Sequence, residues 1–288
     1  MGQSTALTEA RMMSTTTRRL SLALVALLVF SAPLQAADDI RLATTTSTEN
    51  SGLLAQILPK FEAKYGAKVR VVAVGTGAAL KLGENCNADV LLVHARPLED
   101  KFMASGFGAV RKDVMYNDFV IVGPKSDPTG VRGIKDVIGA MKKIAASGAK
   151  FVSRGDESGT HQMEKSYWKD AGAQPQGGAY VSTGQGMGQV LTMAGELQGY
   201  TLSDRATFAA YRDKTGLEIL VEGDPRMFNP YGVIAVSPQK CPGVNNKGAM
   251  ALVDWMVSPE GQQAIAAFKV NGQQMFFPDA KPALKPAA

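Results

Sequence analysis

The sequence predicts an α/β protein with two lobes. Its 288 residues exceed one typical domain, and 45% hydrophobic with 20% charged residues allows a sizeable core. From residue 38 onward, short apolar runs alternate with amphipathic segments of helical length. Strands that alternate with helices favour parallel sheets, in which ligands bind at the carboxyl ends of the strands.

The individual elements follow from this alternation. Strands are expected where apolar runs lie between turn residues, at 39–43, 68–74, 88–93, 119–123, 150–153, 198–202, 217–221 and 231–236. Helices are expected where apolar residues recur with helical spacing, at 51–64, 77–83, 97–104, 133–146, 158–170, 186–194, 203–210, 247–256 and 259–268.

Two apolar runs are candidates for strands that cross between the lobes. Met115–Pro124 and Asn229–Val236 both combine turn-like residues with an apolar stretch. If both cross, the chain builds one lobe, then the other, and returns, and a ligand cleft closes by a hinge motion. The expected bounds are lobe I at 38–118 and 231–280, lobe II at 119–230 and a loose tail at 281–288. The alternative is one large domain in which both runs are ordinary strands.

Residues 1–37 are predicted to be a secretory signal peptide. Arg18 and Arg19 precede the apolar run Leu20–Phe30, and small residues follow it. The run is too short to span a bilayer comfortably. Cleavage near Ala36 or Ala37 predicts an exported, periplasmic protein.

The charge pattern argues against nucleic acid as a partner. The formal net charge is +5, and residues 1–36 hold three Arg and one Glu, so +3 remains on the rest of the chain. The basic residues are scattered, and Lys142-Lys143 fits a solvated helix face better than a nucleic-acid patch.

Cysteine and histidine are scarce. An exported protein can form a disulfide, so Cys86 and Cys241 are either bonded or two free thiols. Two His in the whole chain make a metal site remote. No metal and no cofactor are expected.

Three segments share one design, in which an apolar strand leads into a cluster of Gly, Ser and Thr and then a helix. We name them the first turn (Thr44–Thr48), the second turn (Gly75–Gly77) and the third turn (Ser153–Thr160). Each can direct backbone N–H groups and hydroxyls at one point, next to the positive end of a helix. With Arg154 and almost no other charge, they predict a cage of neutral donors around a small inorganic oxyanion.

The first two turns also have simpler interpretations. Alone, the hydroxyl run of the first turn is a polar capping loop. The second turn lacks the spacing of a nucleotide-binding loop, since Leu80 stands where a third glycine is required. Its glycines fit a close approach of the backbone to a small ligand.

The third turn carries the most specific chemistry. Arg154 can contact an oxyanion in a bidentate manner, and Ser158 and Thr160 add hydroxyl donors at a helix start. Asp156 and Glu157 are expected to cap the helix and pair with Arg154, and Asp156 is also a candidate acceptor for a protonated anion. His161 is expected to pack or cap.

A fourth turn (Val181–Gly188) precedes another helix and would close the second lobe over a ligand. Thr183, Gly184 and Gln185 are its weaker ligand candidates, and a simple helix cap explains them equally well.

At these residues the chain resembles the tungstate-binding proteins of tungstate ABC importers, over roughly residues 39–275. The matching segments are Thr44–Ser47, Ser51–Leu54, Val74–Gly77, Ala88–Ala95, Val114–Pro124, Phe151–His161, Gly184–Gly188 and Tyr200–Arg205. The resemblance implies a periplasmic-binding-protein fold of type II, with two α/β lobes joined by two crossing strands. One departure is Glu84–Asn87, where the family often has a turn with Gly and Asp.

The resemblance also implies the ligand set and the partner. Contacts to a tetrahedral dianion are expected from Thr45, Thr46, Ser47, Thr76, Arg154, Ser158 and Thr160, with Gly184 added from the fourth turn. The protein is then the substrate-binding component of an ABC importer, a monomer that delivers tungstate or molybdate to a membrane permease. A sensory or scavenging binding protein would have the same features.

Two other functions compete. Phosphate or sulfate could fill the same cage, and hydrogen phosphate needs an acceptor for its proton, for which Asp156 is the candidate. A serine hydrolase using Ser158 with His161 or His94 is the alternative from a different class. The string Gly155-Asp-Glu-Ser158-Gly159 lacks the G-x-S-x-G spacing, so no catalytic residue is expected.

Overall fold

The computed structural model describes residues 39–280. The predicted signal peptide with its cleavage site and the predicted tail 281–288 lie outside the described residues. Within residues 39–280, no helix is both long and apolar enough to cross a membrane.

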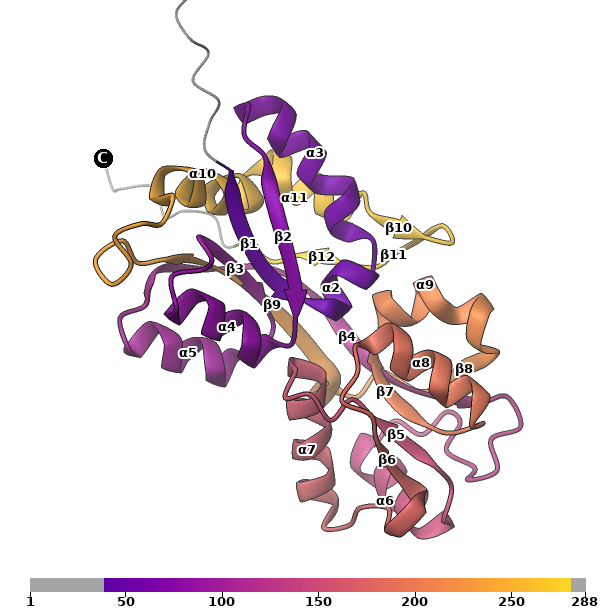
Figure 1. The fold of residues 1–288 in the computed structure, drawn as a ribbon. Coiled ribbons are helices and arrows are strands. Elements are labelled where there is room, and N and C mark those ends of the chain that lie inside the picture. Colours follow the sequence, from indigo (N-terminus) through magenta and orange to yellow (C-terminus); the bar gives the residue numbers. More distant parts are fainter. Residues whose placement is uncertain (1–38, 281–288) are drawn as a thin grey trace, which may run out of the picture. The chain divides into compact units, whose positions relative to one another are not determined.

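The largest sheet has eight strands in the order β12-β4-β9-β3-β1-β2, with β7 and β8 paired to β4 (Figure 1). These strands are β1 (Ile40–Thr45), β2 (Val69–Val74), β3 (Val90–Val93), β4 (Gly108–Pro124), β7 (Thr201–Asp204), β8 (Leu217–Val221), β9 (Phe228–Val236) and β12 (Phe277–Pro278). Two small sheets pair β5 (Phe151–Ser153) with β6 (Tyr180–Ser182) and β10 (Lys269–Val270) with β11 (Gln273–Gln274).

The α-helices lie close to their predicted positions, and α2 and two short 3₁₀ helices are additions. They are α2 (Thr46–Asn50), α3 (Leu53–Tyr65), α4 (Thr76–Glu84), α5 (Arg96–Ala104), α6 (Val137–Ser147), α7 (Gly159–Ala171), α8 (Met187–Glu196), α9 (Arg205–Thr215), α10 (Asn246–Val257), α11 (Pro259–Ala266) and the short η1 (Gly177–Ala179) and η2 (Pro225–Met227). The sequence did not predict α2. Gly52, at φ +85°, separates α2 from α3 because this backbone conformation is open to glycine but strained for other residues.

The expectation of parallel sheets is only partly correct. β1 is parallel to both β2 and β3, and β5 is parallel to β6. β9 is antiparallel to β3 and β4, and β7 and β8 are antiparallel to β4. The reason is that β9 returns the chain alongside β4, so these two strands run in opposite directions.

β4 belongs to both halves of the sheet. Gly108–Asp118 pairs with β9, whereas Phe119–Pro124 pairs with β7 and β8. β9 begins at Phe228 opposite Asp118 and stays in the first half. Among the strands of residues 39–280, β4 is therefore the one that pairs with strands of both halves. The sequence missed the first part of β4 because Arg111, Lys112 and Asp113 interrupt its apolar pattern.

The hydrophobic core is divided in the same way. One pair of clusters packs around Phe61 and Trp255 and around Phe102. A second pair packs around Phe151 and Trp168 and around Phe208. We call the first half lobe I and the second half lobe II. Their bounds at 118/119 and 230/231 remain a proposal, supported by the change of partners along β4.

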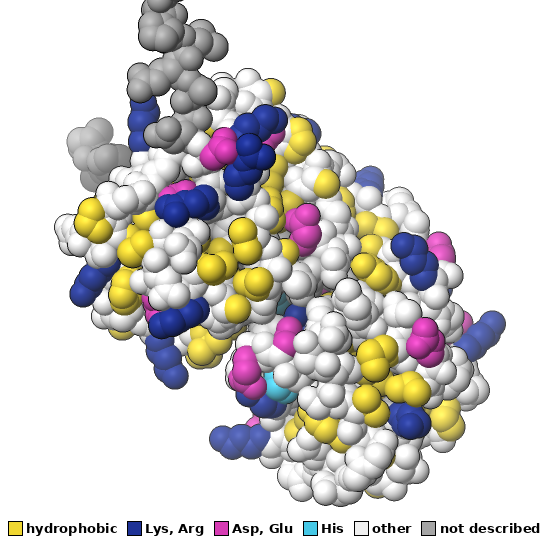
Figure 2. Space-filling view, in the orientation of Figure 1, with side chains coloured by type: hydrophobic (Ala, Val, Ile, Leu, Met, Phe, Trp, Pro, Cys, Tyr) yellow, Lys and Arg dark blue, Asp and Glu magenta, His cyan; other side chains and the backbone are white. Residues whose placement is uncertain are grey.

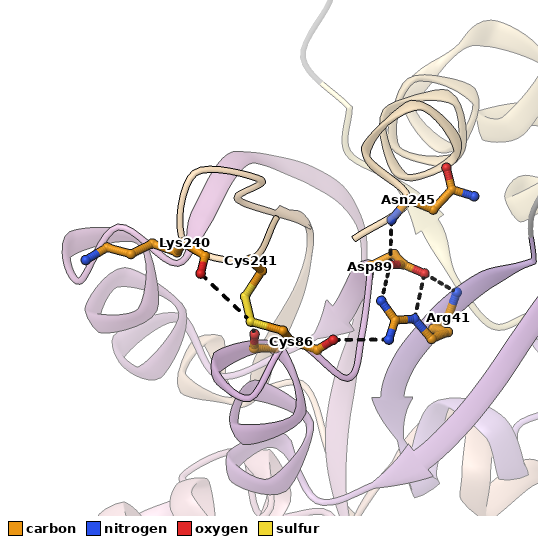
Figure 3. Close-up of a disulfide and its surroundings, with 7 residues drawn as sticks. Arg41, Cys86, Asp89, Lys240, Cys241 and Asn245 are labelled. Carbon is orange, nitrogen blue, oxygen red and sulfur yellow. Dashed lines mark hydrogen bonds and ion pairs between the residues drawn. A yellow bond between two sulfur atoms is a disulfide. The ribbon is translucent and has the colours of Figure 1, made fainter. Parts of the chain in front are cut away.

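A disulfide joins Cys86 to Cys241 in lobe I, with an S–S distance of 2.08 Å (Figure 3). It connects the segment after α4 to the loop before α10. Beside it, Asp89 receives hydrogen bonds from Arg41 Nη2 at 2.6 Å and from the backbone N–H of Asn245 at 2.9 Å. The disulfide and the hydrogen bond from Asn245 to Asp89 both hold the loop between β9 and α10 against the segment between α4 and β3.

On the face in Figure 2, Lys and Arg side chains are dispersed among Asp and Glu and do not form one basic patch. This distribution agrees with the scattered basic residues of the sequence.

Candidate anion-binding site

The four turns approach one another where lobe I meets lobe II. A Cβ atom on Gly75 of the second turn would lie 3.1 Å from the backbone oxygen of Asp156 in the third turn. A Cβ atom on Gly186 of the fourth turn would lie 3.4 Å from the side chain of Thr46. These contacts are tight for any larger residue, so glycine allows turns from different lobes to pack together.

Arg154 lies at the centre of this region. It follows β5 and is 1% exposed, which makes it one of the largest fully buried side chains in the described part of the chain. Its Nη2 donates to Thr46 Oγ1 at 2.8 Å and to Asp156 Oδ2 at 2.5 Å, and its Nη1 lies 3.5 Å from Ser47 Oγ. A buried guanidinium from lobe II therefore faces the hydroxyls of the first turn.

Buried polar atoms without a partner occur in the second and third turns. Within residues 39–280, five buried side-chain polar atoms lack a hydrogen-bond partner, and three of them belong to predicted ligand residues: Thr76 Oγ1, Thr160 Oγ1 and Arg154 Nε. Such atoms are rare in folded proteins because each costs about 1–3 kcal/mol of stability. All three can donate a hydrogen bond, which is what a site for an anion requires.

The first turn divides into two kinds of side chain. Thr46 and Ser47 face Arg154, as described above. The Thr45 hydroxyl is 2.7 Å from Thr48 Oγ1, 3.1 Å from His94 Nε2 and 3.2 Å from the Thr48 N–H, which it accepts. Its hydrogen-bonding capacity is thus used inside the protein, and a direct contact from Thr45 to an anion stays an untested prediction.

The two acidic residues of the third turn have different roles. Asp156 pairs with Arg154 and accepts from the Ser158 N–H at 3.2 Å. Burial raises the pKa of Asp156, but the Arg154 charge and these hydrogen bonds outweigh it, so the pKa lies below its ordinary value. The expectation that Glu157 pairs with Arg154 is wrong, since Glu157 points outward to Lys165.

Ser158 and His161 do not form a catalytic pair. The Ser158 hydroxyl caps α7 by accepting from the His161 backbone N–H at 3.2 Å. The His161 ring accepts from the Glu157 N–H at its Nδ1 atom, at 3.0 Å. His161 thus has the packing or capping role expected from the sequence, whereas Ser158, predicted as an anion ligand, is the N-cap of α7 and its contact with an anion stays a prediction. The geometry gives a hydrolase no support.

The fourth turn contacts the other turns through Thr183, one of its three candidates, and through Gly186. The Thr183 hydroxyl donates toward the backbone oxygens of Ser153 and Arg154, at 3.1 and 3.2 Å, and so ties the fourth turn to the third. Gly184 is exposed, with φ +67°. Gly186, which was not a candidate, is the residue that packs against Thr46.

Several buried polar residues behind the turns were missed. His94, Asn117, Asp204, Thr207 and Asn229 are each at most 5% exposed and hydrogen-bonded to one another or to the first turn. The position of both Asn residues at the edges of the predicted crossing strands was the one available signal. In residues 39–280 no group of three or more His, Cys, Asp and Glu could hold a metal ion.

Two lobes that share a strand, with hydrogen-bond donors of both lobes at one point, define a solute-binding protein of the periplasmic-binding-protein class. A family model described as a PBP superfamily domain matches residues 31–260. The chain belongs to this superfamily and, within it, to the family of the tungstate-binding protein TupA. It is 48% identical over 250 residues to TupA of Peptoclostridium acidaminophilum, covering 85% of this chain and 87% of the relative.

Solved structures agree with this assignment. The tungstate ABC transporter structure from Geobacter sulfurreducens is 55% identical, with a TM-score of 0.74 over 80% of this chain and 98% of that chain. Tungstate-binding TupA from Desulfovibrio alaskensis G20 is 49% identical, with a TM-score of 0.70 over 85% of this chain and 100% of that chain. The family is one of binding proteins, so this chain is a binding protein and not an enzyme.

Proposed function

We propose that this protein captures tungstate between its lobes and delivers it to the membrane permease of an ABC importer. The observation that carries the proposal is the buried Arg154 together with two buried, unpartnered hydroxyls of the second and third turns, Thr76 Oγ1 and Thr160 Oγ1. Its relatives named as tungstate-binding proteins support the choice of anion. Tungstate and molybdate have nearly the same size and charge, so molybdate is a second ligand in this proposal.

A fully deprotonated oxyanion suits the donors. Tungstate offers acceptor oxygens only, and Arg154, Thr76 and Thr160 all donate. The carboxylate of the turns that faces Arg154 is Asp156, and its two oxygens already accept hydrogen bonds from Arg154 and Ser158. Hydrogen phosphate would need an acceptor for its proton, which makes it the weaker candidate.

The number of donors is sufficient for tight binding. A hydrogen bond to a charged group contributes about 1.5–3 kcal/mol, so six donors, one each from Thr46, Ser47, Thr76, Arg154, Ser158 and Thr160, give about 9–18 kcal/mol before costs. Association and lobe closure subtract several kcal/mol, which leaves an affinity in the nanomolar range within reach. The proposal needs no apolar or aromatic pocket.

The proposal includes a location and a partner. An ABC importer takes its substrate from a binding protein outside the membrane, which matches the predicted signal peptide and a periplasmic, monomeric protein. Closed lobes present one continuous surface to the permease, and an anion that closes the lobes thereby marks the protein as loaded.

Titration calorimetry of the mature protein with tungstate, molybdate, sulfate and phosphate at neutral pH tests the proposal. Tight binding of tungstate, with much weaker binding of sulfate and phosphate, is expected. A preference for phosphate would assign Asp156 as a proton acceptor and contradict the tungstate proposal. Binding of none of the four anions would contradict an oxyanion site altogether.

A further inference from the structure

A row of buried hydrogen bonds runs behind the first turn from lobe I to lobe II. Thr45 Oγ1 lies 3.1 Å from His94 Nε2, and His94 Nδ1 lies 3.0 Å from Asn229 Oδ1. Asn229 Nδ2 donates to Asn117 Oδ1 at 2.7 Å, and Asn117 Nδ2 donates to Asp204 Oδ1 at 3.3 Å. We call these five residues the crossing network, because Asn117 and Asn229 are register partners where β4 changes lobes.

The chemistry of the groups fixes the direction of every bond in the crossing network. A carboxylate can only accept, so Asn117 must turn its amide NH2 to Asp204 and its oxygen to Asn229. Asn229 must then accept from His94, which places the His94 proton on Nδ1. Nε2 of a neutral imidazole can only accept, so the Thr45 hydroxyl donates to it.

In this arrangement the Thr45 hydroxyl has no proton left to donate to a ligand. The Thr45 proton goes to His94, and its oxygen accepts from the Thr48 N–H and from the Thr48 hydroxyl. Thr45 is the N-cap residue of α2, the helix that carries Thr46 and Ser47. A fixed Thr45 therefore holds these two hydroxyl groups opposite Arg154.

The crossing network ends at the side chain of Asp204, which has one oxygen without a hydrogen-bond partner in the described part of the chain. Asp204 is 0% exposed; its Oδ1 also accepts from the Thr207 N–H at 2.9 Å, and its Oδ2 has no partner in the described part of the chain. Thr207 in turn donates from Oγ1 to the backbone oxygen of Ser47 at 2.8 Å. The hydrogen bonds thus form a closed path that begins at Thr45 and ends at Ser47, both in the first turn.

We propose that Asp204 is a positioning residue of the anion site. Its carboxylate sets the direction of the crossing network, and the network fixes Thr45 and, through it, the placement of Thr46 and Ser47. This inference rests on the proposed function, because it assigns Thr45 to support the site and not to contact the anion. It also gives Asn117 on β4 and Asn229 on β9 a role in the site.

The charges around the network agree with this direction. Burial and the nearby Arg154 charge lower the pKa of His94 to about 4, although its hydrogen bond to Asn229 acts in the other direction, so the ring is neutral at pH 7. Burial raises the pKa of Asp204 above its ordinary value, although its hydrogen bonds from Thr207 and Asn117 and the Arg154 charge act in the other direction. A proton on the unpartnered Oδ2 would leave Oδ1 the acceptor for Asn117 and Thr207, so the direction of the network does not depend on this pKa. Tyr231 on β9 is the other titratable group that faces Asp204, and burial keeps it protonated by raising its pKa.

The histidine tautomers test the direction without any anion. The chain has two His, so nitrogen-15 labelling of histidine gives two ring systems to assign by NMR. His94 should carry its proton on Nδ1. His161 is an internal reference of the opposite kind, because its Nδ1 accepts from the Glu157 N–H and its proton must sit on Nε2. A His94 proton on Nε2 in the wild type would overturn the proposal, since the row would then run the other way and free the Thr45 hydroxyl.

Variants of Asp204 test its control over the site. Asp204→Leu removes the acceptor, so a mixture of His94 tautomers and a loss of tungstate affinity of at least about tenfold are expected. Asp204→Asn keeps an acceptor oxygen and should restore most of both. Asp224→Leu is the matched control, since Asp224 is a buried carboxylate that caps a turn elsewhere in lobe II.

Each outcome bears on a separate claim. An unchanged His94 tautomer and unchanged affinity in Asp204→Leu would contradict the positioning role. If Asp204→Leu does not fold, Asn117→Leu decides, because it breaks the link between Asp204 and Asn229. An unchanged His94 tautomer and unchanged affinity in that variant contradict the role, and a change in both supports it. A wild type that binds no anion yet has the Nδ1 tautomer would contradict the proposed function while leaving the direction of the network established.

Discussion

The guanidinium of Arg154 in lobe II donates a hydrogen bond of 2.8 Å to the Thr46 hydroxyl in lobe I. This bond joins the two lobes at the proposed anion site. Arg154 also holds Asp156 with the same Nη2 atom, so one side chain links the first turn, the third turn and the proposed ligand. Its Nε–H remains available.

Arg154 is expected to control anion affinity. Arg154→Ala should weaken tungstate binding by at least about tenfold, because a hydrogen bond to a charged group contributes about 1.5–3 kcal/mol. Arg154→Lys should also bind poorly, since an ammonium group keeps the charge but lacks the planar fork. Calorimetry measures both, with Arg132→Lys on the surface of lobe II as a control that keeps its affinity. An Arg154→Ala variant with wild-type affinity would refute the cage.

Removal of either unpartnered hydroxyl, Thr76 Oγ1 or Thr160 Oγ1, should stabilise the ligand-free protein and weaken anion binding. Thr76→Val and Thr160→Val remove buried donors that lack partners, so each should raise the free energy of unfolding without ligand by about 1 kcal/mol. Each should also weaken tungstate binding by about tenfold, because a donor to the anion is lost. Urea denaturation and calorimetry measure the two effects.

Thr44→Val is the matched control for these variants. The Thr44 hydroxyl is buried but donates to the Leu92 backbone oxygen at 2.7 Å. Its loss should lower the free energy of unfolding by about 1 kcal/mol and leave the affinity nearly unchanged. If Thr44→Val and Thr76→Val behave alike in both measurements, the distinction between partnered and unpartnered hydroxyls has no functional meaning.

Glu164 predicts a pH dependence of stability. It is buried on α7 and accepts from Ser153, Trp168 and Tyr180, and burial raises its pKa from 4.5 to about 7. A raised acid pKa means that the protonated form is favoured in the folded state. Its stabilisation is therefore complete below pH 4.5 and is lost as the pH rises through about 7.

Glu164→Gln isolates this effect. A shift of one pKa unit corresponds to 1.36 kcal/mol, so the wild type should lose about 3 kcal/mol relative to the variant between pH 4.5 and pH 8. Urea denaturation of both proteins across this range measures the difference. Parallel stability curves for wild type and variant would show that Glu164 does not titrate in this way.

The disulfide should stabilise lobe I through its long loop. Cys86 and Cys241 are 155 residues apart, and a loop of this size predicts a stabilisation of up to about 5 kcal/mol, with about 2–4 kcal/mol typical of measured bonds. Addition of reductant should lower the free energy of unfolding by this amount. The double variant Cys86→Ser with Cys241→Ser should be insensitive to reductant, and an equal effect of reductant on it would exclude the bond as the cause.

Local patterns predicted most elements of the fold. Apolar runs marked β1, β2 and β3, and amphipathic spacing marked α3 through α11 within a few residues. The first part of β4 was not predictable, because Arg111 reads as a polar position until Glu99 is known to pair with it at 2.7 Å. α2 was missed because a run of Thr and Ser disfavours a helix, and its N-cap bond from Thr48 to Thr45 appears only in the folded chain.

For the candidate site, too, sequence patterns identify some residues and not others. Arg154, Thr76 and Thr160 were candidates from the sequence because each lies in a segment that leads from the end of a strand into the first turn of a helix. His94, Asn117, Asn229 and Asp204 were not, because they meet through the pairing of β9 with β3 and β4 and the pairing of β4 with β7. Side chains brought together by strand register leave no spacing signal in the sequence.

A crystal structure of the protein grown with tungstate tests the central claim most directly, because the anomalous scattering of tungsten locates the anion without bias. The account predicts a single anion within about 3.2 Å of the Arg154 guanidinium and of the hydroxyls of Thr76 and Thr160. Tungsten at any other position, or crystals with no tungsten at these three residues, would contradict it.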